Sequence, residues 1–194
     1  MNLLWRIWNK LVLRPCYRLR FREFGRHVSI RRPVCLKGVK YMSVGDRVIV
    51  KERGWLEARP LERGGECLLS IGSGTSIGYF SQIYAVRRIE IAENVLMGSG
   101  VYITDCTHGY EDVSRPVIGQ PSRFVAAVEI GEGSWIGSHA ALIGVKVGRH
   151  CVVGANAVVT EDVPDYCVVA GVPARIVKRY DPDTGEWERL SGKK

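Results

Sequence analysis

The residue best suited to acid–base chemistry is His108, one of four histidines in the chain. It ends the segment Ile103-Thr-Asp-Cys-Thr-His and precedes 109–129, the longest interruption of a six-residue repeat. A titratable imidazole between a regular element and a loop is well placed to exchange a proton with a substrate. We predict that His108 is a general base, the alternative being a surface histidine at a corner of the repeat. Asp105 is expected to orient His108 or to bind an acceptor hydroxyl, although an ordinary turn aspartate fits the same position.

His139 and His150 raise the question of a metal site. Both lie three residues after an apolar position of the repeat, but in segments that would occupy different faces. A catalytic zinc ion needs convergent protein ligands. The six cysteines show neither Cys-x-x-Cys nor another metal-ligand spacing. We therefore predict no metal, and reduced thiols of the kind found in cytoplasmic proteins, several of them packed.

The repeat itself defines the expected fold. Apolar anchors recur at every sixth position in five groups of three, namely 44/50/56, 71/77/83, 91/97/103, 130/136/142 and 147/153/159, and glycine follows eight of these fifteen anchors. A period of six fits neither an α-helix nor an antiparallel sandwich, but it fits a short parallel strand and a turn, stacked coil upon coil. The prediction is an all-β fold of about five triangular coils, with glycine relieving turns of positive φ.

Interruptions of the repeat follow the third segment of a group each time, at 57–70, 89–90 and 109–129. They would therefore all lie at one corner of the prism. The turn after Leu142 is instead one residue short, which predicts a tightened corner at Leu142–Val147.

Three stretches carry a family resemblance: Ile71-Gly-Ser-Gly-Thr-Ser, the run from Ser134-Trp-Ile-Gly-Ser-His to Val153-Gly-Ala-Asn-Ala-Val-Val-Thr, and Val169-Ala-Gly-Val-Pro-Ala-Arg. Over residues 44–180 the chain resembles the hexapeptide-repeat acyltransferases, and within them the maltose, galactoside and surface-polysaccharide O-acetyltransferases. The resemblance implies a left-handed parallel β-helix, a homotrimer and acetyl-CoA as donor.

The same resemblance implies roles for named residues. His108 occupies the position of the family's catalytic histidine. Ser138, Ala155 and Thr160 are expected beside the pantetheine arm of CoA, with the Ser138 backbone N–H as an oxyanion donor. Tight packing between coils is the alternative reason for these small residues.

Further positions follow from the resemblance. Trp135 is expected at the acceptor or thioester end, unless it is simply a packed corner residue. Arg175 and Lys178 are expected to contact the CoA phosphates, unless they form a solvated basic patch. Glu161 stands where the family often has lysine, which puts one phosphate contact in doubt.

The loop 109–129 is expected to shape an acceptor pocket or to brace a trimer. Arg115 or Arg123 could contact an anionic glycan or a diphosphate.

The formal charge of +8 is concentrated near the N-terminus, because residues 1–32 hold nine Lys and Arg against one acidic residue. Residues 33–194 hold nineteen basic and nineteen acidic residues. We therefore divide the chain into a basic arm (1–32), a β-helix domain (33–180) and a C-terminal tail (181–194), which begins with a turn and is loose unless Trp187 folds back. A neutral body argues against a nucleic-acid partner.

Residues 2–13 have the apolar and basic spacing of an amphipathic helix, which Pro15 should end or kink. Such an arm would either contact an anionic membrane surface or cap the coil stack. The apolar run 3–13 is too short and too charged for a membrane span or a signal peptide. We expect a cytoplasmic protein, with peripheral contact at the inner membrane face as one possibility.

The reading that joins these features is an acetyl-CoA-dependent O-acetyltransferase acting on a sugar hydroxyl of a surface polysaccharide or its precursor. N-acetylation of an amino sugar, a non-catalytic trimeric scaffold and a metal-dependent hydratase are the alternatives.

Overall fold

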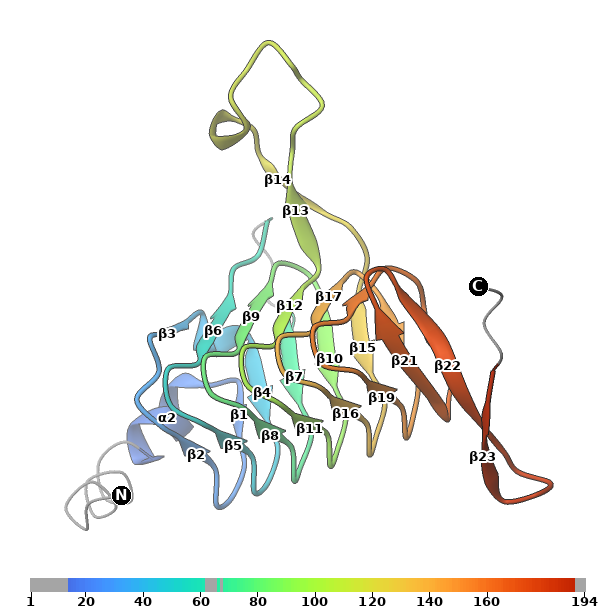
Figure 1. Cartoon of the computed structure of the whole chain (residues 1–194). Helices are drawn as coiled ribbons and strands as arrows, with labels where there is room; N and C mark the ends of the chain where they lie inside the picture. The colour runs from blue at the N-terminus through green and yellow to red at the C-terminus, as the bar shows by residue number, and fades with distance from the viewer. Residues whose placement is uncertain (1–13, 62–65, 67, 191–194) are drawn as a thin grey trace.

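The computed structural model describes residues 14–61, 66 and 68–190. Within them the chain winds into a prism of stacked coils whose sides are three parallel sheets (Figure 1). We name these sheets A, B and C, in the order in which each coil visits them. Helix α2 (Arg14–Arg20) precedes the first coil, and antiparallel strands follow the last one.

The strands of the prism are short. Sheet A contains β1 (Glu23–Phe24), β4 (Met42–Val44), β7 (Leu69–Ile71), β10 (Ile89–Ile91), β15 (Val128–Ile130) and β18 (Lys146–Val147). Sheet B contains β2 (Ser29–Ile30), β5 (Ile49–Val50), β8 (Ser76–Ile77), β11 (Leu96–Met97), β16 (Trp135–Ile136) and β19 (Val152–Val153). Sheet C contains β3 (Cys35–Lys37), β6 (Trp55–Ala58), β9 (Gln82–Ala85), β12 (Tyr102–Thr104), β17 (Ala141–Ile143) and β20 (Val158–Val159). A 3-10 turn, η2 (Val39–Tyr41), joins β3 to β4.

The apolar anchors stack on one another in register. In sheet A, for example, Val44 pairs with Ile71, Ile71 with Ile91, and Ile91 with Ile130. All fifteen anchors are buried, and none exposes more than 3% of its surface. The predicted period and the three-sided coil are therefore confirmed.

A further coil precedes those predicted. Phe24, Ile30 and Leu36 are also six residues apart, and their strands pair with β4, β5 and β6. The described chain thus forms six three-stranded coils instead of about five. The predicted boundary at residue 32 cuts through the first of them.

Helix α2 packs on this first coil through aromatic rings. The ring centroid of Tyr17 lies 5.6 Å from that of Phe21 and 5.7 Å from that of Phe24. Pro15 does not end the helix but lies in its first described turn, where the missing N–H of proline is tolerated. The helix predicted in residues 2–13 lies outside the described residues. No helix of the described part has the length and apolar character needed to cross a bilayer.

The glycines that follow the anchors have a different role from the predicted one. A Cβ added at Gly72 would lie 2.5 Å from the backbone N of Glu93 in the next coil. Gly72 itself has no positive φ. Glycine is required there because neighbouring coils approach closely, and the positive φ occurs two residues later, at Gly74.

The C-terminal segment is ordered beyond the last coil. Strands β21 (Cys167–Gly171), β22 (Ala174–Asp181) and β23 (Glu186–Arg189) continue sheet B, and β21–β22 and β22–β23 pair antiparallel. Trp187 packs edge-on against Tyr180, with ring centroids 5.7 Å apart. Residues 181–190 therefore form the predicted turn and an ordered strand that folds Trp187 back, instead of a loose tail.

The shortened corner lies between β17 in sheet C and β18 in sheet A. Gly144 makes the turn with a φ of 58°, and its N–H donates to the Thr104 carbonyl over 3.0 Å. A Cβ at Gly144 would lie 2.8 Å from Cγ1 of Val125. The tight corner therefore packs against the segment that returns from the 109–129 excursion.

Replacing Gly144 by alanine should destabilise the protein, because both the left-handed φ and the Val125 contact oppose a Cβ. We expect Gly144→Ala to lower the free energy of unfolding by about 1–3 kcal/mol in urea denaturation. Gly119→Ala is the matched control, since a Cβ there meets nothing within 4 Å. Equal effects of the two substitutions would contradict this account of the corner.

Candidate functional site

His108 lies where the chain leaves the coil stack. After β12 the chain turns at Asp105, and β13 (Cys106–His108) pairs antiparallel with β14 (Ser122–Phe124), placing His108 opposite Ser122. This hairpin projects from the prism at the top of Figure 1. His108 does not close a coil, as the repeat suggested; it stands exposed on the first strand of the projection.

The segment beyond His108 is held by its own hydrogen bonds. Gln120 is buried, and its Nε2 donates to the carbonyls of Asp112 and Arg115 over 3.0 and 3.2 Å. Arg123 forms an ion pair with Glu111 at 2.6 Å. A 3-10 turn, η3 (Val117–Gly119), lies on the returning side, two residues before β14. His108 therefore stands at the base of a braced hairpin rather than beside a loose loop.

Both arginines of the hairpin already have partners. The Arg115 guanidinium donates to the Gly119 carbonyl over 2.6 Å, and Arg123 is paired with Glu111. An anionic glycan would have to compete with these contacts.

Asp105 has a different role from the two that were predicted. Its carboxylate is fully buried and accepts the backbone N–H groups of Val86, Arg87 and Arg88 over 2.7–2.8 Å. Its own carbonyl accepts the N–H of Val125, which returns from the hairpin. Because this carboxylate is fully buried and engaged by three backbone donors, it is not exposed to an acceptor, and no hydrogen bond joins it to His108 within the described residues. Asp105 instead ties both ends of the hairpin to the coil below and acts as a positioning residue.

The corner between sheets B and C carries Ser138 and Ala155 in successive coils. The Ser99 N–H donates to the Ser138 Oγ of the next coil over 3.3 Å. In the following coil the equivalent corner residue is Ala155, which has no side-chain oxygen. Within the described residues the Ser138 N–H consequently finds no acceptor. This unused donor, on a half-buried residue, suits an oxyanion.

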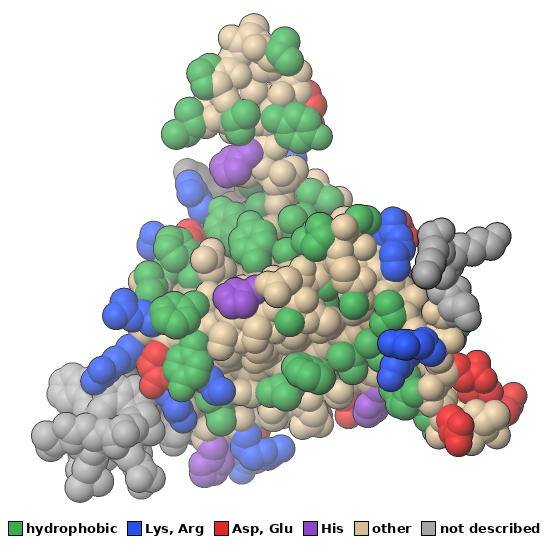
Figure 2. Space-filling model, viewed as in Figure 1, with side chains coloured by type: hydrophobic (Ala, Val, Ile, Leu, Met, Phe, Trp, Pro, Cys, Tyr) green, Lys and Arg blue, Asp and Glu red, His purple; other side chains and the backbone are tan. Residues whose placement is uncertain are grey.

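Trp135 lies on the outer face of sheet B and exposes 51% of its surface. Its neighbours in register are Leu96, which is 53% exposed, and Val152. Sheet C adds the exposed rings of Trp55 and Tyr102. The side turned to the viewer in Figure 2 accordingly shows many hydrophobic side chains.

The outer face of sheet A is polar by contrast. Its outward positions in consecutive coils are Ser43, Ser70, Glu90, Glu129 and Lys146. Exposed apolar area of the kind seen on sheets B and C usually marks an interaction surface.

The residues predicted to contact CoA phosphates lie at the C-terminal end. Arg175 and Lys178 are on β22, and Thr160, which was predicted beside the pantetheine arm, follows β20. The Arg175 guanidinium pairs with Glu161 at 3.4 Å. Both side chains are exposed, so this pair contributes little stability, but Glu161 partly cancels the charge that a phosphate would meet.

The single chain does not bring all these residues together. His108 leaves the prism at the corner between sheets C and A, whereas Ser138 and Ala155 lie at the corner between B and C. One whole side of the prism separates the two corners. A centre that uses both must therefore draw them from two copies of the chain.

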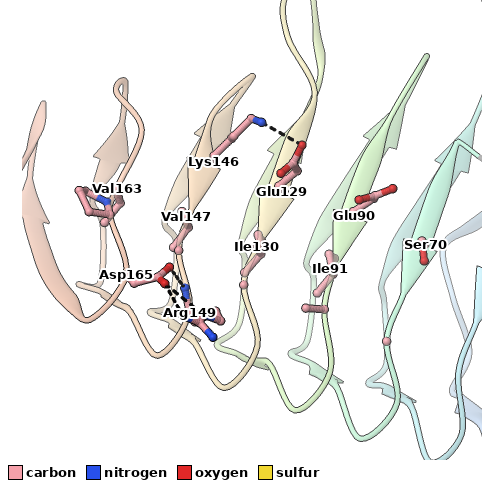
Figure 3. Close-up of a pocket in the computed structure, with 15 residues that line it drawn as sticks. Ser70, Glu90, Ile91, Glu129, Ile130, Lys146, Val147, Arg149, Val163 and Asp165 are labelled. Atoms are coloured by element: carbon pink, nitrogen blue, oxygen red, sulfur yellow. Dashed lines mark hydrogen bonds and ion pairs between the residues drawn. The ribbon is translucent and has the colours of Figure 1, made fainter.

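The described part of the chain also has a groove of about 630 Å³ on sheet A, lined by residues from β7, β10, β15 and β18 (Figure 3). Four of its five charged side chains pair with one another, Lys146 with Glu129 at 3.1 Å and Arg149 with Asp165 at 2.9 Å. The fifth, Glu90, pairs with Arg88 outside the groove at 3.1 Å. The Arg149 backbone N–H and guanidinium hold the pKa of Asp165 below its usual range. None of the predicted site residues lines this groove, so we do not assign the chemistry to it.

The remaining titratable side chains are structural. His139 lies at the corner between B and C and His150 at the corner between A and B, as predicted, and His150 stacks on Tyr166. No group of three His, Cys, Asp or Glu suited to a metal ion occurs among the residues that the structure describes. Burial raises the pKa of the Cys106 thiol, which disfavours the thiolate needed for a nucleophile. Cys35, Cys106, Cys151 and Cys167 are buried, as expected for packed thiols.

Known proteins share both the repeat and the coil. A family described as "hexapeptide repeat of succinyl-transferase" matches residues 127–161. A protein of Mycobacterium tuberculosis classed as an acetyltransferase is 32% identical over 82% of this chain and 54% of its own length. An Escherichia coli K12 protein classed as a lipopolysaccharide biosynthesis O-acetyltransferase is 32% identical over 66% of this chain and 69% of its own. The chain thus spans about half of the first relative and two thirds of the second.

A solved structure confirms the fold. An N-acyltransferase from Bacillus cereus, in complex with dTDP and 3-hydroxybutyryl-CoA, superimposes with a TM-score of 0.72. The match covers 88% of this chain and 89% of that one at 19% sequence identity, so it supports the β-helix architecture alone.

The role of Asp105 can be tested by Asp105→Asn. The amide keeps the shape but loses the charge and places an NH₂ group against backbone donors. We expect the free energy of unfolding to fall by about 1–3 kcal/mol, with faster hydrogen exchange at Arg87 and Val125. Asp162→Asn is the matched control, because Asp162 accepts a single N–H, that of Lys146, at the same type of corner. A loss at Asp162 as large as that at Asp105 would refute the anchoring role.

Proposed function

Because the chain belongs to the hexapeptide-repeat acetyltransferase family, we propose that it is an acetyl-CoA-dependent O-acetyltransferase with the left-handed β-helix of that family. Its acceptor is a sugar hydroxyl of a surface polysaccharide or its precursor. The observation that carries the proposal is His108, exposed at the base of a hairpin that Asp105 anchors to the coil stack.

His108 supplies the base. Its neutral imidazole removes the proton of the acceptor hydroxyl as the oxygen attacks the thioester carbonyl carbon of acetyl-CoA. The new C–O bond gives a tetrahedral intermediate with a negative oxygen. When this intermediate collapses, the C–S bond breaks and CoA leaves as thiolate, which recovers a proton from the imidazolium.

Ser138 supplies the oxyanion contact. Its backbone N–H lacks an acceptor within the described chain, whereas the N–H of Ser99, one coil earlier, is already bound. A rigid, unused donor needs no reorganisation when negative charge develops on the carbonyl oxygen.

The acetyl-CoA groove of this proposal lies at the same corner, between sheets B and C. Ser138 and Ala155 leave room for the pantetheine arm, Trp135 lies beside it on sheet B, and Thr160 continues it. Arg175 and Lys178 would meet the CoA phosphates, with Glu161 weakening the first of these contacts.

A homotrimer completes the site. His108 and Ser138 lie at different corners of one prism, and the exposed apolar side chains of sheets B and C need a partner. Packing of these faces in a closed ring of three chains would bring the hairpin of one copy to the donor groove of the next.

Two observations bear on the acceptor. The Escherichia coli relative is classed in lipopolysaccharide biosynthesis, which favours a surface glycan. The Bacillus cereus neighbour is an N-acyltransferase that binds dTDP, which keeps N-acylation of a nucleotide-linked amino sugar as the second candidate. A panel of matched hydroxy and amino sugars, free and nucleotide-linked, separates the two.

Removing the base should abolish most of the activity. We expect His108→Ala to reduce kcat by about 10²–10⁴-fold in a spectrophotometric assay of CoA release, with acetyl-CoA binding retained. His150→Asn is the control, because His150 lies at another corner and asparagine tolerates its φ of 49°. Near-normal turnover by His108→Ala would refute the assignment. Failure of the folded protein to bind acetyl-CoA in calorimetry would favour the scaffold alternative.

Occupying the Ser138 N–H should slow the reaction. Ala155→Ser places a hydroxyl beside the Ser138 N–H. In the preceding pair of coils, the Ser138 Oγ has the same position beside the Ser99 N–H. We expect kcat to fall about tenfold or more as the new Oγ competes with the oxyanion, with little change in acetyl-CoA affinity. Ala155→Gly adds no acceptor and should keep near-normal turnover. Equal rates for the serine and glycine variants would exclude Ser138 as the donor.

A further inference from the structure

The N-terminal end of the prism is strongly basic in its folded part. Residues 14–61, which form α2 and the first two coils, hold thirteen Lys and Arg against four acidic residues. From residue 62 onward the chain holds thirteen basic and sixteen acidic residues. We call α2 and the first two coils the basic end. Its charge belongs to rigid coils and not only to an appended arm.

Most of this charge is exposed and unneutralised. Arg18, Arg20, Arg32, Lys37 and Arg53 are all exposed, and within the described residues none of them forms an ion pair. In Figure 2 Lys and Arg side chains line the N-terminal side of the visible face, and a further group lies beside the C-terminal strands.

The four acidic residues of the basic end offset less than a third of its thirteen positive charges. Asp46 is paired with Arg26 at 3.5 Å. Glu57 accepts the Trp55 indole N–H over 3.1 Å.

The charges also lie close together along the axis. Coils stack at the strand spacing of about 4.8 Å, so two coils span roughly 10 Å. This is comparable to the Debye length of about 8 Å at physiological salt. An anionic surface at the end of the stack would therefore meet most of these side chains at once.

Apolar side chains stand among the cations. Leu19, between Arg18 and Arg20, exposes 88% of its surface, and Val34 exposes 59%. The opposite side of α2 is occupied, since Tyr17, and Phe21 directly after the helix, pack against Phe24 of the first coil. A helix that buries aromatic rings in the protein and presents leucine with arginines outward fits the boundary between lipid headgroups and acyl chains. The phosphates of a nucleic acid would pair with the cations but would make no apolar contact with the exposed Leu19.

We propose that the basic end binds the surface of an anionic lipid bilayer, with cations of the first two coils contributing alongside α2. The sequence alone left open whether residues 1–32 contact a membrane or cap the coil stack. The proposed membrane contact extends to rigid positions such as Lys37 and Arg53. This inference does not depend on the proposed acetyl transfer.

The test uses the full chain in vesicle flotation. Vesicles of phosphatidylcholine containing phosphatidylglycerol should bind the protein, and pure phosphatidylcholine vesicles should not. Arg32→Glu/Lys37→Glu/Arg53→Glu should weaken binding at least tenfold. The matched control, Lys178→Glu/Arg179→Glu/Arg189→Glu, makes the same charge change at the other end and should bind within twofold of the wild type. Unchanged binding by the first variant, or an equal loss by the control, would overturn the proposal.

A second variant separates lipid from other polyanions. Leu19→Ser keeps every charge and should weaken vesicle binding several-fold while leaving thermal unfolding unchanged. If the protein instead binds a DNA duplex more tightly than the vesicles, and Leu19→Ser has no effect, the partner is a nucleic acid and the lipid assignment is wrong. Acetyl transfer to a soluble sugar, measured in parallel, shows whether the catalytic proposal stands independently.

Discussion

Every other feature of this molecule depends on the in-register stacking of one buried apolar side chain per face and coil. Val44, Ile71, Ile91 and Ile130 form one such column, and each is almost fully buried. Because the coils lie only one strand spacing apart, a residue such as Gly72 must be glycine to admit the next coil. Because of this short spacing, equivalent corner residues of successive coils lie next to one another and form a column. The side chain in one coil then determines whether a backbone N–H of the neighbouring coil has an acceptor. A single missing oxygen at Ala155 can therefore leave the Ser138 N–H available.

This rigidity decides where chemistry can be placed. In a coil of this shape, residues at two different corners stay apart. A site that combines such residues therefore needs an interruption of the repeat or a second copy of the chain. The hairpin that begins at Cys106 is such an interruption, and Asp105 fixes both of its ends. The apolar faces of sheets B and C are the proposed interface between copies of the chain, whereas sheet A is polar and the charged side chains of its groove are paired.

The period of six predicted the sheets, the anchors and the register, because stacking allows one solution for that spacing. It missed the first coil, since aromatic Phe24 and a half-buried Leu36 stand where later coils have buried aliphatic anchors, and many arginines surround them. The position of His108 was predictable as the edge of an interruption, but the hairpin that carries it was not. The role of Asp105 was also hidden, because its three partners lie in the preceding coil, 17–19 residues away in sequence. The spare donor of Ser138 required knowledge of which side chains share a column.

The central claim, that the centre is shared between copies of the chain, is tested most directly by complementation. His108→Ala removes the base, and Ala155→Trp fills the groove beside Ser138, so each variant alone should be inactive. Co-expressed in equal amounts, they should form mixed trimers in which about a quarter of the sites combine an intact His108 with an intact groove. Recovery of about a quarter of wild-type activity is the predicted result. Mixed trimers that remain inactive would show that each chain carries its own complete site and would contradict the account.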